Sequence, residues 1–124
     1  MTPSQIIMAD AKKNGRDPKV ALLTVHEMMV RKLGFILHSG KSVLALVNLG
    51  NEKYETHLYS VDSPLRLSHA MVKFYNDLKK LHVQAIYGQA DNPQIINLLK
   101  SLAKHEHTEV LDPDKPNYNW MIAL

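Results

Sequence analysis

The sequence predicts a mixed α/β fold, with an opening helix, an antiparallel meander and a second half in which helices alternate with strands. Helix-start signals occur at Pro3, Pro64 and Pro93, and short apolar runs separated by glycine-containing turns fill residues 35–61. The alternation after the meander requires a crossover, so one strand should have a parallel neighbour in a mixed sheet. The length suits a single domain, 1–124.

A capping box predicts the first helix, over about Pro3 to Lys13. Thr2 can accept a hydrogen bond from the helix backbone, and Gln5 can return one. Proline suits the first helical position because its missing N–H would have no partner there. We expect Gly15 to end this helix.

The segment Val20 to Leu33 fits two structures. Asp17 as a cap, followed by Pro18, favours a helix. The run from Leu22 to Val25 has the composition of a short buried strand. The residues leave both interpretations open.

Three strands are predicted in the meander. Apolar runs cover Phe35–His38 and Ser42–Leu49, with the turn Ser39-Gly40-Lys41 between them. A second turn at Gly50-Asn51 leads to an alternating segment, Tyr54–Val61. Alternation places His57 and Tyr59 on one face of that strand, with Glu55 beside them.

The strongest helical pattern begins at Ser63-Pro64 and extends to about Lys80. A short apolar strand, Val83–Tyr87, follows and should end at Gly88. The expected buried stripe of the helix is Leu67, Met71, Phe74, Leu78 and Leu81.

A last helix should open at Asn92-Pro93, and two strands, Thr108–Leu111 and Tyr118–Leu124, should complete the sheet. The expected inward residues of this helix are Ile95, Ile96, Leu99, Leu102 and Ala103.

Composition excludes several kinds of function. Hydrophobic residues at 45% and charged residues at 22% indicate a globular chain. The absence of cysteine removes disulfides, thiolate nucleophiles and zinc–thiolate sites. No apolar run is long enough to span a membrane, and the first residues lack a secretory signal pattern. Neither a phosphate-binding P-loop nor a serine nucleophile elbow is present.

The seven histidines do not form a metal-binding motif. The stretch beginning His26-Glu27 starts like a zinc-protease helix, but Val30 stands where the second ligand is needed. The stretch His105-Glu106-His107 lies at a predicted helix C-terminus, where histidine is favoured by the helix dipole. We therefore assign no metal-ligating residue.

From Phe35 to Leu124 the order of elements resembles the GNAT acetyltransferase family. That resemblance implies acyl-coenzyme A, held by a glycine-rich turn where the meander enters the next helix. Here the corresponding segment, Val61–Ser68, contains no glycine. Pro64 removes one backbone donor, and Asp62 places a negative charge where a pyrophosphate would lie.

Two further positions of the family pattern do not indicate its chemistry. Asn92 matches a family asparagine in place, but an asparagine before proline is an ordinary helix cap. The family's helical tyrosine falls at Leu98 or Leu99. We therefore assign no catalytic and no cofactor-binding residue, and expect no cofactor.

The chain also resembles the small acetyltransferase-like virion proteins of short-tailed bacteriophages. This resemblance implies a non-catalytic structural protein that binds other virion proteins in a multi-copy assembly. It places the protein in a virion assembled in the host cytoplasm, and it favours a strand within Val20–Arg31. The residues that carry it are Ala11 to Gly15, Asp17-Pro18, Tyr87-Gly88-Gln89, Asn92 and Pro93–Leu102.

Two alternatives remain open. The first is an active N-acyltransferase in which Glu55 or His57 serves the attacking amine as a general base. Its cofactor would lie near Ser63, Arg66 and Asn92. The second is an accessory protein that contacts nucleic acid through the basic face of one helix. That face carries Arg66, Lys73, Lys79 and Lys80.

Overall fold

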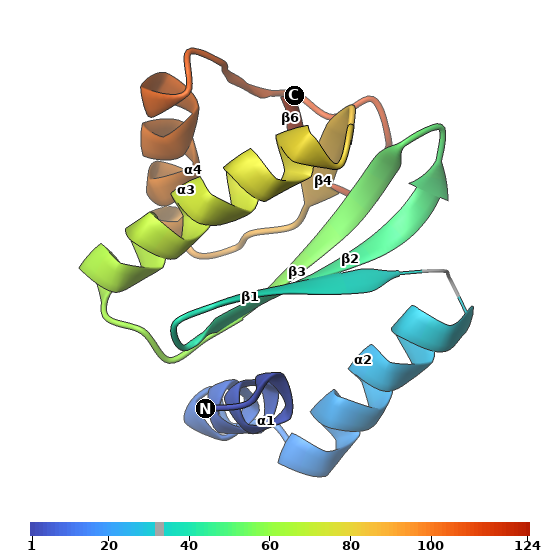
Figure 1. Ribbon diagram of the computed structural model, residues 1–124, viewed down its shortest axis with the longest axis vertical. Helices are drawn as coiled ribbons and strands as arrows, with labels where there is room; N and C mark the ends of the chain where they lie inside the picture. The colour runs from blue at the N-terminus through green and yellow to red at the C-terminus, as the bar shows by residue number, and fades with distance from the viewer. Residues whose placement is uncertain (32–33) are drawn as a thin grey trace.

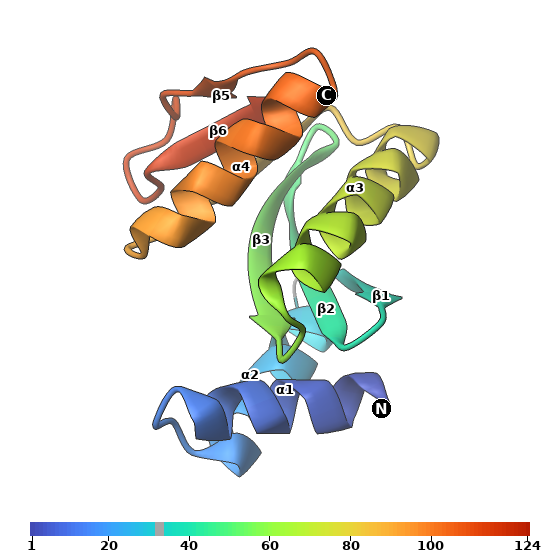
Figure 2. The same cartoon turned by 90° about the vertical axis from the view of Figure 1, so that its left-hand side faces the viewer.

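The computed structural model describes residues 1–31 and 34–124. A six-stranded sheet with the order β1-β2-β3-β4-β6-β5 lies between two pairs of helices. Helices α1 and α2 cover one face and α3 and α4 the other (Figures 1 and 2). The elements are α1 Pro3–Lys13, α2 Pro18–Arg31, β1 Phe35–Ser39, β2 Ser42–Gly50, β3 Lys53–Ser60, α3 Pro64–Lys80, β4 Ala85–Gly88, α4 Pro93–His105, β5 Val110–Leu111 and β6 Trp120–Ala123.

The sheet is mixed, as the sequence predicts. Strands β1, β2 and β3 form the antiparallel meander. Strand β4 returns through α3 to lie parallel to β3, which is the expected crossover. Strand β6 then pairs antiparallel with both β4 and β5. The result is a sheet whose only parallel contact among the described residues lies between β3 and β4.

Helix α1 has the predicted capping box. The Thr2 backbone N–H donates to Gln5 Oε1 at 2.8 Å, and the Gln5 N–H donates to Thr2 Oγ1 at 3.2 Å. The chain leaves the helix through Asn14 and Gly15, whose φ of 71° lies in the region that glycine favours.

Helix α2 decides the segment that the sequence left open. Residues Pro18–Arg31 are helical, so the strand implied by the phage resemblance is wrong. Asp17 Oδ1 accepts the N–H groups of Lys19 and Val20 at 2.9 and 3.2 Å, which fixes the first turn. Leu33 lies outside the described residues. The helix packs through Ala21, Leu22, Val25, Met28 and Met29, which recur at helical spacing.

The meander turns lie close to their predicted places. Gly40 has a φ of 57° in the first turn, between β1 and β2. The second turn falls on Asn51 and Glu52, with φ values of 55° and 61°, because Gly50 still belongs to β2. Two consecutive residues with positive φ suit a tight hairpin.

Helices α3 and α4 bury most of their predicted stripes against the face of the sheet opposite α1 and α2. Leu81 is an exception, being 54% exposed, because α3 ends at Lys80 and Leu81 caps it. In α4, Ile95 and Ile96 are only partly buried. The residues of the predicted stripes that are buried are Leu67, Met71, Phe74 and Leu78 in α3, and Leu99, Leu102 and Ala103 in α4.

The last three strands are shorter than predicted. Strand β4 begins at Ala85, although Val83 is buried, and Gly88 belongs to it. Residues 108 and 109 precede β5 without strand structure, and residues 118 and 119 precede β6 in the same way. Just before β6, the Asn119 side chain bonds the backbone of Ala90 in both directions, at 3.0 and 3.1 Å, while its own N–H donates to the Gly88 carbonyl at 3.0 Å.

A buried carboxylate, Asp10, fixes α1 to the sheet. It is 7% exposed. One oxygen accepts the Ser60 backbone N–H at 3.1 Å, and the other accepts the Arg16 guanidinium at 3.1 Å. No sequence pattern indicates this role, because the three groups meet only in the folded chain.

We predict that Asp10→Ala lowers the free energy of unfolding by about 1–3 kcal/mol, since it leaves the part-buried Ser60 N–H without its acceptor. Urea denaturation followed by circular dichroism measures this. Asp112→Ala, at an exposed loop position, is the matched control and should change stability by less than about 0.5 kcal/mol. Equal effects of the two substitutions would contradict the role given to Asp10.

Candidate functional site

The candidate site lies where β3 and β4 diverge. The two strands pair only from Lys53 to Glu55, opposite Ala85 to Tyr87. The Thr56 hydroxyl donates to the Tyr87 carbonyl at 2.9 Å, just beyond the last pair. Past this bond the strands separate, and two adjoining hollows, which share Leu58 and Ile95, follow the open part of β3.

The first hollow, here called the β3–β4 groove, has a volume of about 920 Å³. It runs between the turn that follows α1 and the loop that precedes β6. Most of its lining side chains are polar, and they come from segments far apart in the sequence. Among them are Asn14, Arg16, Glu55, His57, Gln89, Asp91, Asn92, Asn117 and Tyr118.

A chain of hydrogen bonds centred on Glu55 lies in this groove. His57 Nε2 lies 2.6 Å from Glu55 Oε2, and the Tyr118 hydroxyl donates to Glu55 Oε1 at 2.7 Å. The sequence placed Glu55 and His57 together but missed Tyr118. No local pattern signals that tyrosine, because it reaches the site from a loop 63 residues further along the chain.

Burial and the Glu55 carboxylate both act on Tyr118. Burial, followed by the hydrogen bond to Glu55, raises the pKa of Tyr118 to about 12. The hydroxyl therefore remains a proton donor at every physiological pH. A phenol hydroxyl, a carboxylate and an imidazole joined by hydrogen bonds could bind a polar ligand or exchange a proton with it.

The other two tyrosines on this face are less accessible. Tyr59, which the sequence grouped with His57, is 8% exposed beneath α1, and burial raises its pKa. Tyr87 is fully buried, and no hydrogen bond of ordinary geometry reaches its hydroxyl within the described residues. Burial first, and the nearby Asp114 carboxylate second, raise the pKa of Tyr87 to about 12.

The second hollow, here called the α4 groove, has a volume of about 690 Å³ and lies between α1, the start of α3 and α4. It includes the segment that would hold a pyrophosphate in the resembled family. Ser63 Oγ accepts the Arg66 N–H at 3.4 Å and so caps α3, while Pro64 offers no N–H.

The Asp62 carboxylate, in the same segment, is hydrogen-bonded to the sheet. One of its carboxylate oxygens accepts the Lys41 N–H at 2.9 Å and the Ser42 hydroxyl at 2.7 Å. The carboxylate is thus held in place by the β1–β2 turn, where it would repel a phosphate. The residues at the start of α3 do not fit a pyrophosphate, which needs several free N–H donors.

The remaining positions of the family pattern are structural. The Asn92 side chain accepts the Gln94 N–H at 2.9 Å and caps α4, as its sequence context predicts. Leu99 is buried in the core, and Leu98 packs against it. Neither position supplies a hydroxyl to the site.

The predicted basic residues of α3 are all exposed. Arg66, Lys73 and Lys80 recur every seven residues and so share one stripe of the helix. Lys79 lies on the flank beside Tyr75, with its ammonium 5.4 Å from the ring centre. These residues lie on the outer surface of α3 and do not reach the candidate site.

Metal binding and membrane spanning have no support among residues 1–31 and 34–124. No group of three or more potential ligands gathers there. His105 Nδ1 lies 3.3 Å from Glu106 Oε1 of the adjacent residue. No helix in the same range combines the length and apolarity needed to cross a membrane.

Comparisons with known proteins identify the fold. An acetyltransferase of the GNAT family from Staphylococcus aureus Mu50 superposes with a TM-score of 0.57 at 13% identity, covering 96% of this chain and 89% of that one. The N-acetyltransferase PseH of Campylobacter jejuni, solved with acetyl coenzyme A, gives a TM-score of 0.52 at 15% identity, covering 100% and 92%. No family model and no curated protein sequence matches the chain.

The expected GNAT-like fold is therefore confirmed. At these identities the likeness extends to the fold and no further. The chemistry of the site must be argued from the residues of this chain.

We predict that Glu55→Gln lowers the pKa of Tyr118 towards the ordinary value near 10, because the substitution removes the carboxylate charge that opposes phenolate formation. Ultraviolet titration of the phenols measures this, with Tyr118→Phe assigning the transition. Glu109→Gln, at an exposed position, is the control. An unchanged titration in Glu55→Gln would show that the two groups do not interact.

The raised pKa of Tyr118 also predicts how the free energy of unfolding changes with pH. The pKa of Tyr118 is higher in the folded than in the unfolded chain. The contribution of this tyrosine to the free energy of unfolding is therefore complete below pH 10 and is lost as the pH rises towards 12. Below pH 10, the free energies of unfolding of the native protein and of Tyr118→Phe, measured by urea denaturation, should therefore change with pH in the same way. Above it, the native protein should lose stability more steeply.

Proposed function

We propose that this chain is a non-catalytic, GNAT-like domain whose function is to bind other proteins. The observation that carries the proposal is the start of α3, where Asp62 bonds the β1–β2 turn and Pro64 removes a donor. A cofactor pyrophosphate would meet a fixed negative charge there instead of free N–H groups. The fold is retained, while the segment that would hold the cofactor instead forms hydrogen bonds that stabilise the sheet.

A more specific setting for this function is a bacteriophage virion, assembled in the host cytoplasm from several kinds of structural protein. Support for this setting comes from the sequence pattern alone, chiefly Ala11 to Gly15 and Tyr87-Gly88-Gln89. Mass spectrometry of purified particles from the source of this sequence tests it directly. Absence of the chain from the particles would remove the virion setting and leave the binding function to be tested separately.

We predict that acetyl coenzyme A does not bind. Isothermal titration calorimetry, with ligand added to millimolar concentration, should show only heat of dilution, because the α3 start lacks the donors that a pyrophosphate needs. Coenzyme A without the acetyl group should behave in the same way. Saturable heat with a micromolar dissociation constant would overturn the proposed function.

A second candidate function, N-acyl transfer, is favoured by the arrangement of Glu55, His57 and Tyr118. These groups could receive a proton from an amine and supply one to a leaving thiolate. A colorimetric assay of thiol release from acetyl coenzyme A, with a panel of primary amines, separates the two functions. Turnover that is lost in both Glu55→Gln and Tyr118→Phe would establish the enzyme.

A further inference from the structure

The turn between α1 and α2 contains Asn14-Gly15, the one place in the sequence where glycine follows asparagine. Asn14 is the C-cap of α1, and Gly15 has a φ of 71°. Both residues are exposed, and among the described residues no atom beyond the chain neighbours of Gly15 comes within 4 Å of where its β-carbon would be. The Asn14 side chain therefore has access to solvent and to a backbone amide that no side chain shields.

An asparagine in this position can react with the backbone, and asparagine is among the thermolabile residues. The Gly15 nitrogen gives its proton to water and attacks Asn14 Cγ. The N–Cγ bond forms, the Cγ–Nδ2 bond breaks, and Nδ2 takes up a proton and leaves as ammonia. Water then opens the resulting succinimide at either carbonyl, which gives aspartate or isoaspartate. The net reaction consumes one water and releases one ammonia.

The residue that follows an asparagine governs how readily this ring closes, because a side chain on it hinders the approach of its nitrogen. Every other asparagine precedes a residue with a side chain, and Asn92 precedes Pro93, which has no N–H. Asn51 is the informative comparison, since it is also exposed in a tight turn but is followed by Glu52. The missing side chain of Gly15, rather than exposure, distinguishes Asn14.

In the folded chain both reacting groups have other partners. Asn14 Nδ2 donates to the Asp10 carbonyl at 2.8 Å, and the Asn14 ψ is 14°. The Gly15 N–H donates to the Lys12 carbonyl at 3.2 Å. Ring closure requires these bonds to break and Asn14 to rotate about ψ. The reaction therefore proceeds through opening of the end of α1, and helix ends are the parts that fray most readily.

The ion pair between Arg16 and Asp10 opposes that opening. Arg16 follows Gly15 directly, and its guanidinium lies 3.1 Å from the Asp10 carboxylate. The same carboxylate accepts the Ser60 N–H of β3 at 3.1 Å. The ion pair thus joins the two sides of the turn across Asn14 and ties them to the sheet, so it governs how often the end of α1 opens.

A carboxylate at position 14 would act on this ion pair. It would stand at the C-terminus of α1, where the helix dipole disfavours negative charge. It would also lack the Nδ2 donor and face the Asp10 carbonyl without a hydrogen bond. Arg16 is the cation within reach, because Asn14 and Arg16 line the β3–β4 groove and the α4 groove together. Pairing with Arg16 relieves both penalties at the expense of Asp10.

We propose that Asn14 is a site of spontaneous deamidation and that the carboxylate formed there draws Arg16 away from Asp10. The contact that fixes α1 to the sheet is then weakened, and α1 loosens. This inference goes beyond the proposed function and does not depend on it, since the reaction needs only solvent water and the turn between α1 and α2.

Mass spectrometry of the full-length protein, digested before and after several weeks at neutral pH and body temperature, measures the reaction. A lysine-specific protease releases Asn14 in residues 14–19 and Asn51 in residues 42–53. We expect the first peptide to gain the mass of deamidation, and to resolve into aspartate and isoaspartate forms, at least about tenfold faster than the second, because Gly15 has no β-carbon.

Variants of the turn test the role of the ion pair. Arg16→Ala should speed the conversion of Asn14 at least about threefold, because the end of α1 then opens more often. Lys19→Ala, which removes an exposed cation from the same region, is the matched control and should leave the rate unchanged. Asn14→Gln should prevent the conversion at this position, because closure would then need a six-membered ring.

The variant Asn14→Asp reproduces one product and tests the loosening of α1. Hydrogen exchange of the Ser60 N–H, which bonds Asp10, should be faster in this variant than in the native protein. The neighbouring Val61 N–H bonds the Lys41 carbonyl instead, and its exchange should be unchanged.

Each result supports or overturns a defined part of the inference. Equal conversion of Asn14 and Asn51, or no conversion of Asn14 in the folded chain, overturns the site. An unchanged rate in Arg16→Ala overturns the control by the ion pair. Unchanged exchange of the Ser60 N–H in Asn14→Asp overturns the loosening of α1. Calorimetry with acetyl coenzyme A decides the proposed function separately in every case.

Discussion

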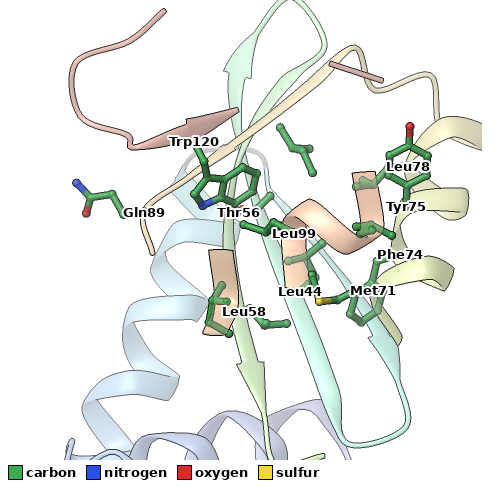
Figure 3. Close-up of a pocket in the computed structure, with 13 residues that line it drawn as sticks. Leu44, Thr56, Leu58, Met71, Phe74, Tyr75, Leu78, Gln89, Leu99 and Trp120 are labelled. Atoms are coloured by element: carbon green, nitrogen blue, oxygen red, sulfur yellow. The ribbon is translucent and has the colours of Figure 1, made fainter. Parts of the chain in front are cut away.

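The divergence of β3 and β4 is the constraint on which the site depends. The strands are parallel neighbours for only three residue pairs, and the Thr56 hydroxyl bonds the Tyr87 carbonyl where the pairing ends. On the other side of β4, Gly88 lets the Trp120 ring pack closely, because a β-carbon there would come within 2.3 Å of the ring. A small residue on β4 and a large one on β6 thus place the Trp120 ring beside the gap, where it lines an apolar pocket of about 90 Å³ (Figure 3).

Two carboxylates then define the open side of β3. Asp10 takes the Ser60 N–H and holds α1, while Asp62 takes the Ser42 hydroxyl and the Lys41 N–H and holds the β1–β2 turn. Each satisfies backbone or side-chain donors that would otherwise be unpaired close to the core. Together they stabilise the end of the meander, and they place negative charge where a phosphate-binding fold would need donors.

The gap therefore differs on its two sides. On the α3–α4 side it is apolar and ends in the pocket beside Trp120. On the other side it is polar, and the Glu55 carboxylate joins His57 to Tyr118. A ligand lying along β3 would contact both environments at once, since alternate side chains of an extended chain point in opposite directions. This asymmetry, more than any single residue, characterises the site.

The sequence by itself determined the helix starts, the meander and the order of elements, because caps, prolines and turn residues act over three or four positions. The absence of a glycine-rich cradle between Val61 and Ser68 could likewise be seen in the sequence alone. The tertiary structure decided what depends on distant partners. Helix α2 formed where a strand was also possible, because its apolar residues pack on α1 and the sheet at helical spacing. Tyr118 joined Glu55 across 63 positions, and a contact of that span leaves no periodic signal in the chain.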